Sequence, residues 1–197
     1  MAGKRGEIWA VNLEQLKKDI QGCNKCDLAK NRTNIVFGNG NEKARLMLIG
    51  EGPGKDEDLQ GVPFVGSAGQ LLNKILEAAD INRDDVYIAN IVKCRPPNNR
   101  VPNRKEVVAC LPWLWQQLEI IKPKIIVLLG STALKNLIKP DALITKFRGE
   151  WMISKSGVKI MPTYHPAALL RDPSKKKKVW EDFKKIRDEY KKINKNV

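Results

Sequence analysis

Four short apolar runs, rich in β-branched residues, are spaced along the chain. They span residues 44–49, 86–92, 124–129 and 158–161. Continuous runs of this length are typical of strands buried on both faces of a parallel sheet. Apolar residues at helical spacing fill the intervals at 67–79 and 104–121. This alternation of strands and helices predicts an α/β sandwich with a mainly parallel sheet.

Apolar spacing also predicts helices near both ends of the chain. Residues 13–20 place their apolar side chains on one side, with Asn12 as the N-cap. A basic helix from about residue 175 carries a Lys-rich outer face and one apolar stripe. The stripe consists of Val179, Phe183, Ile186, Tyr190 and Ile193. Such a stripe favours a helix docked on the domain.

Cap and turn signals refine these elements. Ser67 and Gln70 have the spacing of a capping box at the start of the 67–79 helix. Ser156-Gly157 lies in a short alternating segment and predicts a hairpin turn that adds an antiparallel piece to the sheet. No repeat, low-complexity linker or abrupt change of composition divides the chain. A single domain over residues 1–197 is therefore expected.

The composition is globular and strongly basic. With 36 Lys+Arg against 22 Asp+Glu, the formal charge is +14, which suits a polyanionic partner such as nucleic acid, or the Lys-rich surface of a heat-adapted protein. No apolar stretch approaches the ~18 residues that a membrane helix needs. No apolar segment follows the N-terminal charges, as it would in a signal peptide. We expect a cytoplasmic protein without membrane contact.

Four cysteines form a candidate metal site. Cys23 and Cys26 have the spacing of a bidentate clip, and Cys94 and Cys110 can supply two further ligands from elsewhere in the fold. Four thiolates suit either tetrahedral zinc or a cubane iron-sulfur cluster. The alternative is four buried free cysteines. A metal centre here would attach the N-terminal arm to the domain.

Three segments reach the carboxyl ends of the predicted strands, where open α/β sheets bind ligands. The first, 50–54, is a glycine-rich loop that presents a lone carboxylate, Glu51, but it lacks the glycine and Ser/Thr positions of a nucleotide-phosphate loop. The second ends in Asn90. The third is 164–166, which contains the one histidine of the chain, His165. One cleft containing a carboxylate, an amide and an imidazole is predicted.

Two segments beside this cleft carry candidate nucleic-acid contacts. The segment after His165 places Leu169 and Leu170 next to Arg171, a combination suited to an apolar wedge backed by a phosphate contact. The proline-rich segment 95–104 contains Arg95 and Arg100 and no acidic residue. It is either a phosphate-binding loop or an ordinary solvated one.

Together these pieces resemble the family 4 uracil-DNA glycosylases, the iron-sulfur branch known from thermophiles. The matching segments are residues 50–54, 62–66, 68–72, 90–97 and 165–171. The resemblance covers about residues 23–174. It implies a three-layer α/β/α sandwich with a central four-stranded, mainly parallel sheet, and hydrolysis of the bond between uracil and deoxyribose. It also implies a 4Fe-4S cluster on the four cysteines, with zinc as the alternative.

The resemblance further implies roles for individual residues. Glu51 and His165 are the expected catalytic residues: Glu51 orients water and stabilises the sugar cation, and His165 donates to uracil O2. Phe64 stacks on the base, and Asn90 reads its edge. The other expected contacts are Gly52 in the pocket, Glu57 within a methyl-excluding wall at 55–59, Asn99 supporting Glu51 or its water, Leu169 or else Leu170 as the wedge, and Arg171, Arg95 and Arg100 at the DNA backbone.

The implied partner is uracil-containing DNA, double- or single-stranded. A monomer is expected, and the sequence contains no convincing peptide for binding a replication clamp. Two other classes compete with the glycosylase. A non-catalytic iron-sulfur or zinc protein that binds nucleic acid would explain the charge and the cysteines, but it leaves Glu51, Phe64, Asn90 and His165 without a role. A nucleotide or phosphotransfer enzyme is disfavoured by the broken phosphate-loop pattern.

Overall fold

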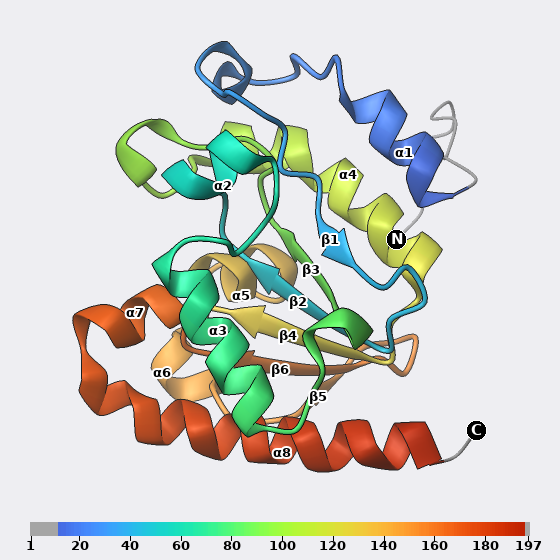
Figure 1. Ribbon diagram of the computed structural model, residues 1–197, viewed down its shortest axis with the longest axis vertical. Helices are drawn as coiled ribbons and strands as arrows, with labels where there is room; N and C mark the ends of the chain where they lie inside the picture. Colours follow the sequence, from blue (N-terminus) through green and yellow to red (C-terminus); the bar gives the residue numbers. More distant parts are fainter. Residues whose placement is uncertain (1–11, 196–197) are drawn as a thin grey trace.

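The computed structural model describes residues 12–195. Residues 1–11 and 196–197, at the two ends of the predicted domain, lie outside the described part. A six-stranded sheet with the order β1-β3-β2-β4-β6-β5 forms the centre (Figure 1). The strands are β1 (Asn39–Gly40), β2 (Leu46–Gly50), β3 (Tyr87–Asn90), β4 (Ile125–Leu129), β5 (Met152–Ile153) and β6 (Lys159–Thr163).

The four central strands, β3, β2, β4 and β6, are parallel and correspond to the four predicted apolar runs. The prediction of four strands omits two short antiparallel edge strands, β1 and β5. Each has only two residues, too few for a periodic signal. The predicted hairpin joins β5 to β6, and Gly157 in its turn adopts a φ of +82°, which glycine accommodates without strain.

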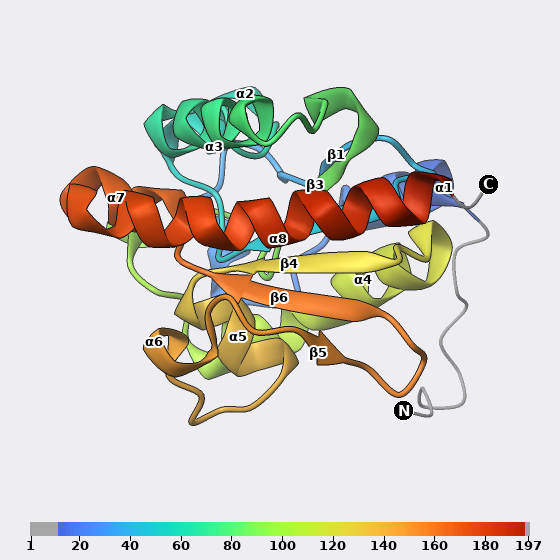
Figure 2. The same cartoon turned by 90° about the horizontal axis from the view of Figure 1, so that it is seen from below.

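Helices cover both faces of the sheet. The α-helices are α1 (Leu13–Ile20), α2 (Lys55–Gln60), α3 (Ser67–Ala78), α4 (Arg104–Ile121), α5 (Ser131–Leu137), α6 (Ile144–Phe147), α7 (Pro166–Arg171) and α8 (Lys176–Lys195). Four 3-10 turns complete the elements: η1 (Asp27–Lys30), η2 (Arg83–Asp85), η3 (Pro97–Asn99) and η4 (Pro173–Lys175). In Figure 2, α3 and α5 lie on opposite sides of the strands. The predicted three-layer sandwich is confirmed.

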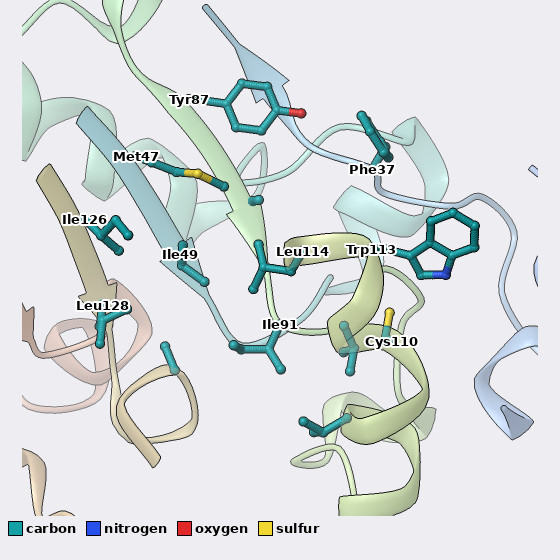
Figure 3. Close-up of a cluster of buried hydrophobic side chains, with 14 of the residues drawn as sticks. Phe37, Met47, Ile49, Tyr87, Ile91, Cys110, Trp113, Leu114, Ile126 and Leu128 are labelled. Atoms are coloured by element: carbon teal, nitrogen blue, oxygen red, sulfur yellow. The ribbon is translucent and has the colours of Figure 1, made fainter. Parts of the chain in front are cut away.

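The alternation of side chains along the strands divides the core in two. Met47 and Ile49 of β2 face α1, α4 and α5, whereas Leu46 and Leu48 face α3 and α8. Figure 3 shows the first core, where Leu114 of α4 lies near Ile49 of β2, and Trp113 of α4 lies farther from the sheet, below Phe37. Burying apolar surface on both faces contributes about 25 cal/mol per Å². Apolar packing on both faces therefore stabilises the sheet between the two helical layers.

Helix starts follow local hydrogen bonds. The Asn12 side chain accepts from the Gln15 N–H at 2.8 Å, as predicted for the cap of α1. The predicted Ser67–Gln70 capping box is wrong: Gly66 is the N-cap of α3, and the Gln70 N–H bonds to the Gly66 carbonyl. Ser67 is already inside the helix. The reason is that the Gly66 N–H is held by another side chain, Glu57, which sets the entry of the helix.

Among residues 12–195, no helix combines the length and the apolar character that a membrane span requires.

Candidate active site

A cavity of about 750 Å³ opens at the carboxyl ends of the parallel strands. These strand ends point to the left in Figure 1. The lining of the cavity comes from the loop after β2, the end of β3, the start of α5 and the start of α7. The cavity is lined by nine of the site residues that were predicted from the sequence: Glu51, Gly52, Glu57, Phe64, Asn90, Asn99, Arg100, His165 and Arg171. The convergence of distant segments expected at this edge of the sheet is therefore present.

Glu51 follows β2 directly and is half-buried. The hydroxyl of Thr132 donates to its carboxylate. Its carbonyl accepts from the Val92 N–H at 3.1 Å, which ties the glycine-rich loop to the segment after β3. Thr132 was not predicted from the sequence, although the Gly130-Ser131-Thr132 turn follows a strand at the same edge. Thr132 thus holds the Glu51 carboxylate, and Val92 holds the Glu51 backbone.

Asn90 is the last residue of β3 and its side chain is 2% exposed. The Oδ1 atom is buried and has no hydrogen-bond partner among the described residues. Gly50 lies against it: a Cβ at Gly50 would stand 2.5 Å from this oxygen and 2.8 Å from the Phe64 ring. Glycine is required here by close approach, and a buried acceptor without a donor is unfavourable unless a ligand supplies one.

Phe64 and His165 form an aromatic wall of the cavity. Their ring centroids are 5.5 Å apart with an interplanar angle of 32°. The Phe64 backbone has a φ of 57°, in the left-handed region, which is unusual for a bulky residue. Strained backbone of this kind concentrates at functional sites. The ring is 7% exposed, so a flat ligand in the cavity would meet its edge or face.

His165 caps α7, and this fixes the chemistry of its ring. Nδ1 accepts from the Ala167 N–H at 3.2 Å, so the proton of the neutral ring belongs on Nε2. Burial, assisted by the positive charge of Arg171, lowers the pKa of His165 to about 4. At neutral pH the imidazole is uncharged and offers one N–H donor to a ligand.

Glu57 and Asn99 are engaged with other groups. The Glu57 carboxylate accepts from the N–H groups of Gly54 at 3.1 Å, Val65 at 3.0 Å and Gly66 at 2.9 Å. It joins the loop after β2 to the loop that carries Phe64, so it shapes the cavity by holding two walls together. Asn99 accepts from Arg95 Nε at 2.8 Å. The predicted support of Glu51 comes from Thr132 instead.

The four cysteines are free thiols, and all four line a second, smaller pocket between α1, η1 and α4. The Lys93 N–H donates to Cys110 Sγ at 3.2 Å, and Arg32 Nη1 donates to Cys94 Sγ at 3.3 Å. Burial raises the pKa of the Cys26 and Cys94 thiols, and raises that of Cys110 to about 12. As they stand, no three His, Cys, Asp or Glu side chains in residues 12–195 converge on a single-ion site.

The segment that forms the cavity matches a known protein family. The model of the uracil DNA glycosylase superfamily matches residues 37–184, which carry both the cavity and two of the cysteines. The chain belongs to this superfamily. The resemblance noted in the sequence is confirmed at the level of the family.

Individual members of the superfamily are similar over most of the chain. The type-4 uracil-DNA glycosylase of Thermotoga maritima is 46% identical over 191 residues, 95% of this chain and 97% of the relative. Those of Sulfurisphaera tokodaii and Archaeoglobus fulgidus are each 46% identical, over 90% and 89% of this chain and 84% and 92% of the relatives. A type-5 uracil-DNA glycosylase of Pyrobaculum aerophilum is 34% identical over 66% of this chain.

The rim of this glycosylase-family cavity corrects one prediction. Leu169, the first choice for the wedge, is 2% exposed and packs in the core beneath α3 and α8. Leu170, the second choice, is 48% exposed on α7. An α7 of six residues turns one leucine inward and the next outward. Leu170 is therefore the apolar side chain that the rim presents to a partner.

Cations surround the mouth of the cavity in this member of the superfamily. Arg171 is exposed beside Leu170. Arg100 lines the opposite part and is paired with Glu106, with 2.6 Å between Arg100 Nη2 and Glu106 Oε1. Arg95 is outside the cavity lining and holds Asn99. The predicted basic loop is thus anchored at its base rather than freely solvated.

Proposed function

We propose that the protein is a DNA-repair glycosylase that hydrolyses the N-glycosidic bond between uracil and deoxyribose and leaves an abasic site. The observation that carries the proposal is the buried, unpartnered Asn90 Oδ1 in a cavity that also contains Glu51 and His165. This acceptor needs a donor from the ligand, and the N3–H of uracil is one. The family and its type-4 members at 46% identity support the same activity.

Base selection follows from the edge that the amide meets. Asn90 Oδ1 accepts from uracil N3–H while its Nδ2 donates to O4, and Phe64 packs against the base. Cytosine has an acceptor at N3 and an amino group at position 4, so it would leave both amide atoms unpaired. Leaving buried polar groups unpaired is how such a site rejects an analogue. The walls joined by Glu57 limit the room beside the base and favour exclusion of the thymine methyl group.

Cleavage breaks the bond between C1′ and N1 of uracil and leaves the electron pair on the base. Negative charge spreads to O2, where His165 Nε2–H donates a hydrogen bond. Positive charge develops on the sugar next to the Glu51 carboxylate. A water oriented by Glu51 forms the new C1′–O bond and loses a proton to solvent, and the uracil anion leaves and takes up a proton from solvent. Preorganised groups of this kind, aimed at developing charge, are worth several kcal/mol.

DNA has to be distorted before the base can reach the cavity. The target nucleotide is flipped out of the stack at a cost of a few kcal/mol. Leu170, exposed beside the mouth, is placed to fill the vacated stack, and Arg171 to contact the neighbouring phosphate. The net charge of +14 supplies the sequence-independent attraction for the backbone.

We further propose that Cys23, Cys26, Cys94 and Cys110 hold a 4Fe-4S cluster, with zinc as the alternative. The fit rests on the gathering of four thiols around one pocket and on the N–H donors aimed at two of the sulfurs. A cubane carries each thiolate on a different iron atom, so the sulfurs need not meet at one point. When bound, the cluster would link the arm that bears Cys23 and Cys26 to the core.

Uracil excision by an Asn90→Asp variant tests base selection. An ionised aspartate accepts but cannot donate, so we expect the ratio of uracil to cytosine excision to fall by about 100-fold or more. The measurement is single-turnover abasic-site formation on matched oligonucleotides. Asn73→Asp, an exposed change on α3, should leave the ratio unchanged. An Asn90→Asp enzyme with the wild-type ratio would refute the pairing scheme.

The metal centre is tested on the protein as purified. We expect iron and acid-labile sulfide in equal amounts, with the broad visible absorption of thiolate-bound iron, and loss of both in Cys94→Ser. Zinc without sulfide would support the alternative cofactor. A metal-free wild-type protein with full excision activity would reject both. Metal with no excision activity would favour a non-catalytic nucleic-acid-binding protein.

A further inference from the structure

A buried cation lies beside the cysteine pocket, apart from the catalytic cavity. Lys93 is 0% exposed, which makes it one of the largest fully buried side chains of the molecule. Its ammonium donates to Gln117 Oε1 at 2.6 Å, and the Gln117 amide donates onward to the Phe37 carbonyl and the Tyr87 hydroxyl. Within residues 12–195, no carboxylate forms an ion pair with it. A charge buried with only neutral partners is strongly unfavourable.

A second cation reaches the same pocket from the arm. Arg32 Nη1 donates to the Cys23 carbonyl at 2.6 Å and to Cys94 Sγ at 3.3 Å. It therefore joins the segment that carries the first two cysteines to the third cysteine in the core. Its guanidinium also has no carboxylate partner among the described residues. Because guanidinium stays protonated at any physiological pH, this charge is permanent.

The other charged groups near the thiols are already paired. Asp27 forms an ion pair with Lys30, and Glu106 with Arg100. Lys25 lines the pocket but is exposed, with its ammonium 4.7 Å from the centre of the Trp113 ring. Of the three lysine and arginine residues that line the pocket without an ion pair among the described residues, Arg32 and Lys93 are the two that are not exposed and that each donate an N–H to a cysteine sulfur.

We propose that Arg32 and Lys93 neutralise an anionic metal centre held by the four cysteines, an inference that rests on the cofactor proposed above. Four thiolates contribute a charge of −4. A 4Fe-4S core in its ordinary state contributes +2, as does a zinc ion, so either centre has a net charge of −2. One guanidinium and one ammonium balance that charge. The buried lysine then has the anion that its environment otherwise lacks, and the centre gains two fixed counter-charges.

Retention of the metal tests the proposal. Arg32→Gln and Lys93→Met are expected to lose iron and sulfide to a chelator in air roughly tenfold faster than wild type, the size typical of removing a group that supports metal ligands. Lys25→Met, which removes an exposed charge at the same pocket, should match wild type. Arg32→Lys keeps the positive charge but loses the forked guanidinium group, so its rate of metal loss should fall between those of wild type and Arg32→Gln. The reduction potential of the cluster should become more negative in Arg32→Gln.

The outcomes distinguish the proposed metal centre from its proposed neutralisation by Arg32 and Lys93. If wild type contains no metal, the cofactor proposal fails and this inference fails with it. If wild type contains the metal but Arg32→Gln and Lys93→Met lose it no faster than Lys25→Met, the charge balance is wrong and the cofactor stands. If Lys93→Met does not fold, Arg32→Gln alone decides, because its side chain is only half-buried. With zinc in place of iron, the same ranking is expected in zinc release.

Discussion

Replacing Glu51 with glutamine is expected to lower the single-turnover rate of uracil excision by about 10²- to 10⁴-fold, because the variant keeps the shape but loses the charge that orients water and faces the sugar cation. Affinity for uracil-containing DNA, measured by equilibrium binding, should stay close to wild type, since the carboxylate is inside the cavity and away from the phosphates. Glu77→Gln, an exposed change on α3, serves as the matched control. A Glu51→Gln enzyme with near-wild-type excision would remove Glu51 from the mechanism.

Variants of Thr132 test the position of the Glu51 carboxylate without removing its charge. Thr132→Val keeps the volume but removes the hydroxyl that donates to the carboxylate, and should slow excision by roughly 10- to 100-fold, the value of one hydrogen bond to a charged group. Thr132→Ser retains the hydroxyl and should recover most of the rate. Equal loss in the valine and serine variants would mean that Thr132 matters for packing alone.

Replacing His165 with alanine is expected to lower the excision rate by about 10²- to 10³-fold, the typical cost of removing a single preorganised donor to a developing oxyanion. His165 also caps α7 through Nδ1, so part of the loss could come from the helix. His165→Asn isolates that part, because asparagine is a good N-cap but lacks the imidazole. Full recovery in the asparagine variant would assign the residue a purely structural role.

The charge state of His165 can be read directly. It is the one histidine of the chain, so its ring protons give a single set of imidazole NMR signals. Because burial lowers the pKa to about 4, these signals should not shift between pH 8 and pH 5 and should move only in more acidic solution. A midpoint near the ordinary value of about 6.5 would contradict the desolvation of the imidazole in the cavity.

The sequence predicted the fold well wherever burial dictates the pattern. The central strands are apolar on both faces because helices cover both, and this produced four continuous runs that the structure confirms. The long helices had clear periodicity. The edge strand β1 could not be predicted, because two residues carry no period, and β5 was anticipated only through the hairpin turn at Ser156-Gly157. The start of α3 at Ser67 was predicted correctly, but its Ser67–Gln70 capping box was wrong, because Gly66 is the N-cap and its N–H donates to Glu57.

The candidate site was predicted from residue types at strand ends, and this identified Glu51, Asn90 and His165 as neighbours. It missed Thr132, because a threonine at the start of a short helix looks like an ordinary cap residue until the fold brings Glu51 against it. The sequence-based prediction also favoured Leu169 over Leu170 as the apolar wedge. Which of two adjacent leucines faces the core depends on the rotation of a six-residue helix, which has too few apolar positions to reveal its buried face.

The segment from Asn90 to Cys94 links the two pockets, with Asn90 in the lining of the cavity and Cys94 in that of the four-cysteine pocket. Its backbone is fixed between them, since Ile91 and Val92 donate to the carbonyls of Gly50 and Glu51, and the Lys93 carbonyl accepts from Val36. A single inserted residue here would displace Asn90 or Cys94, whereas the hairpin at 154–158 lies outside the lining of both pockets. One short segment thus couples the position of the cavity to that of the four-cysteine pocket.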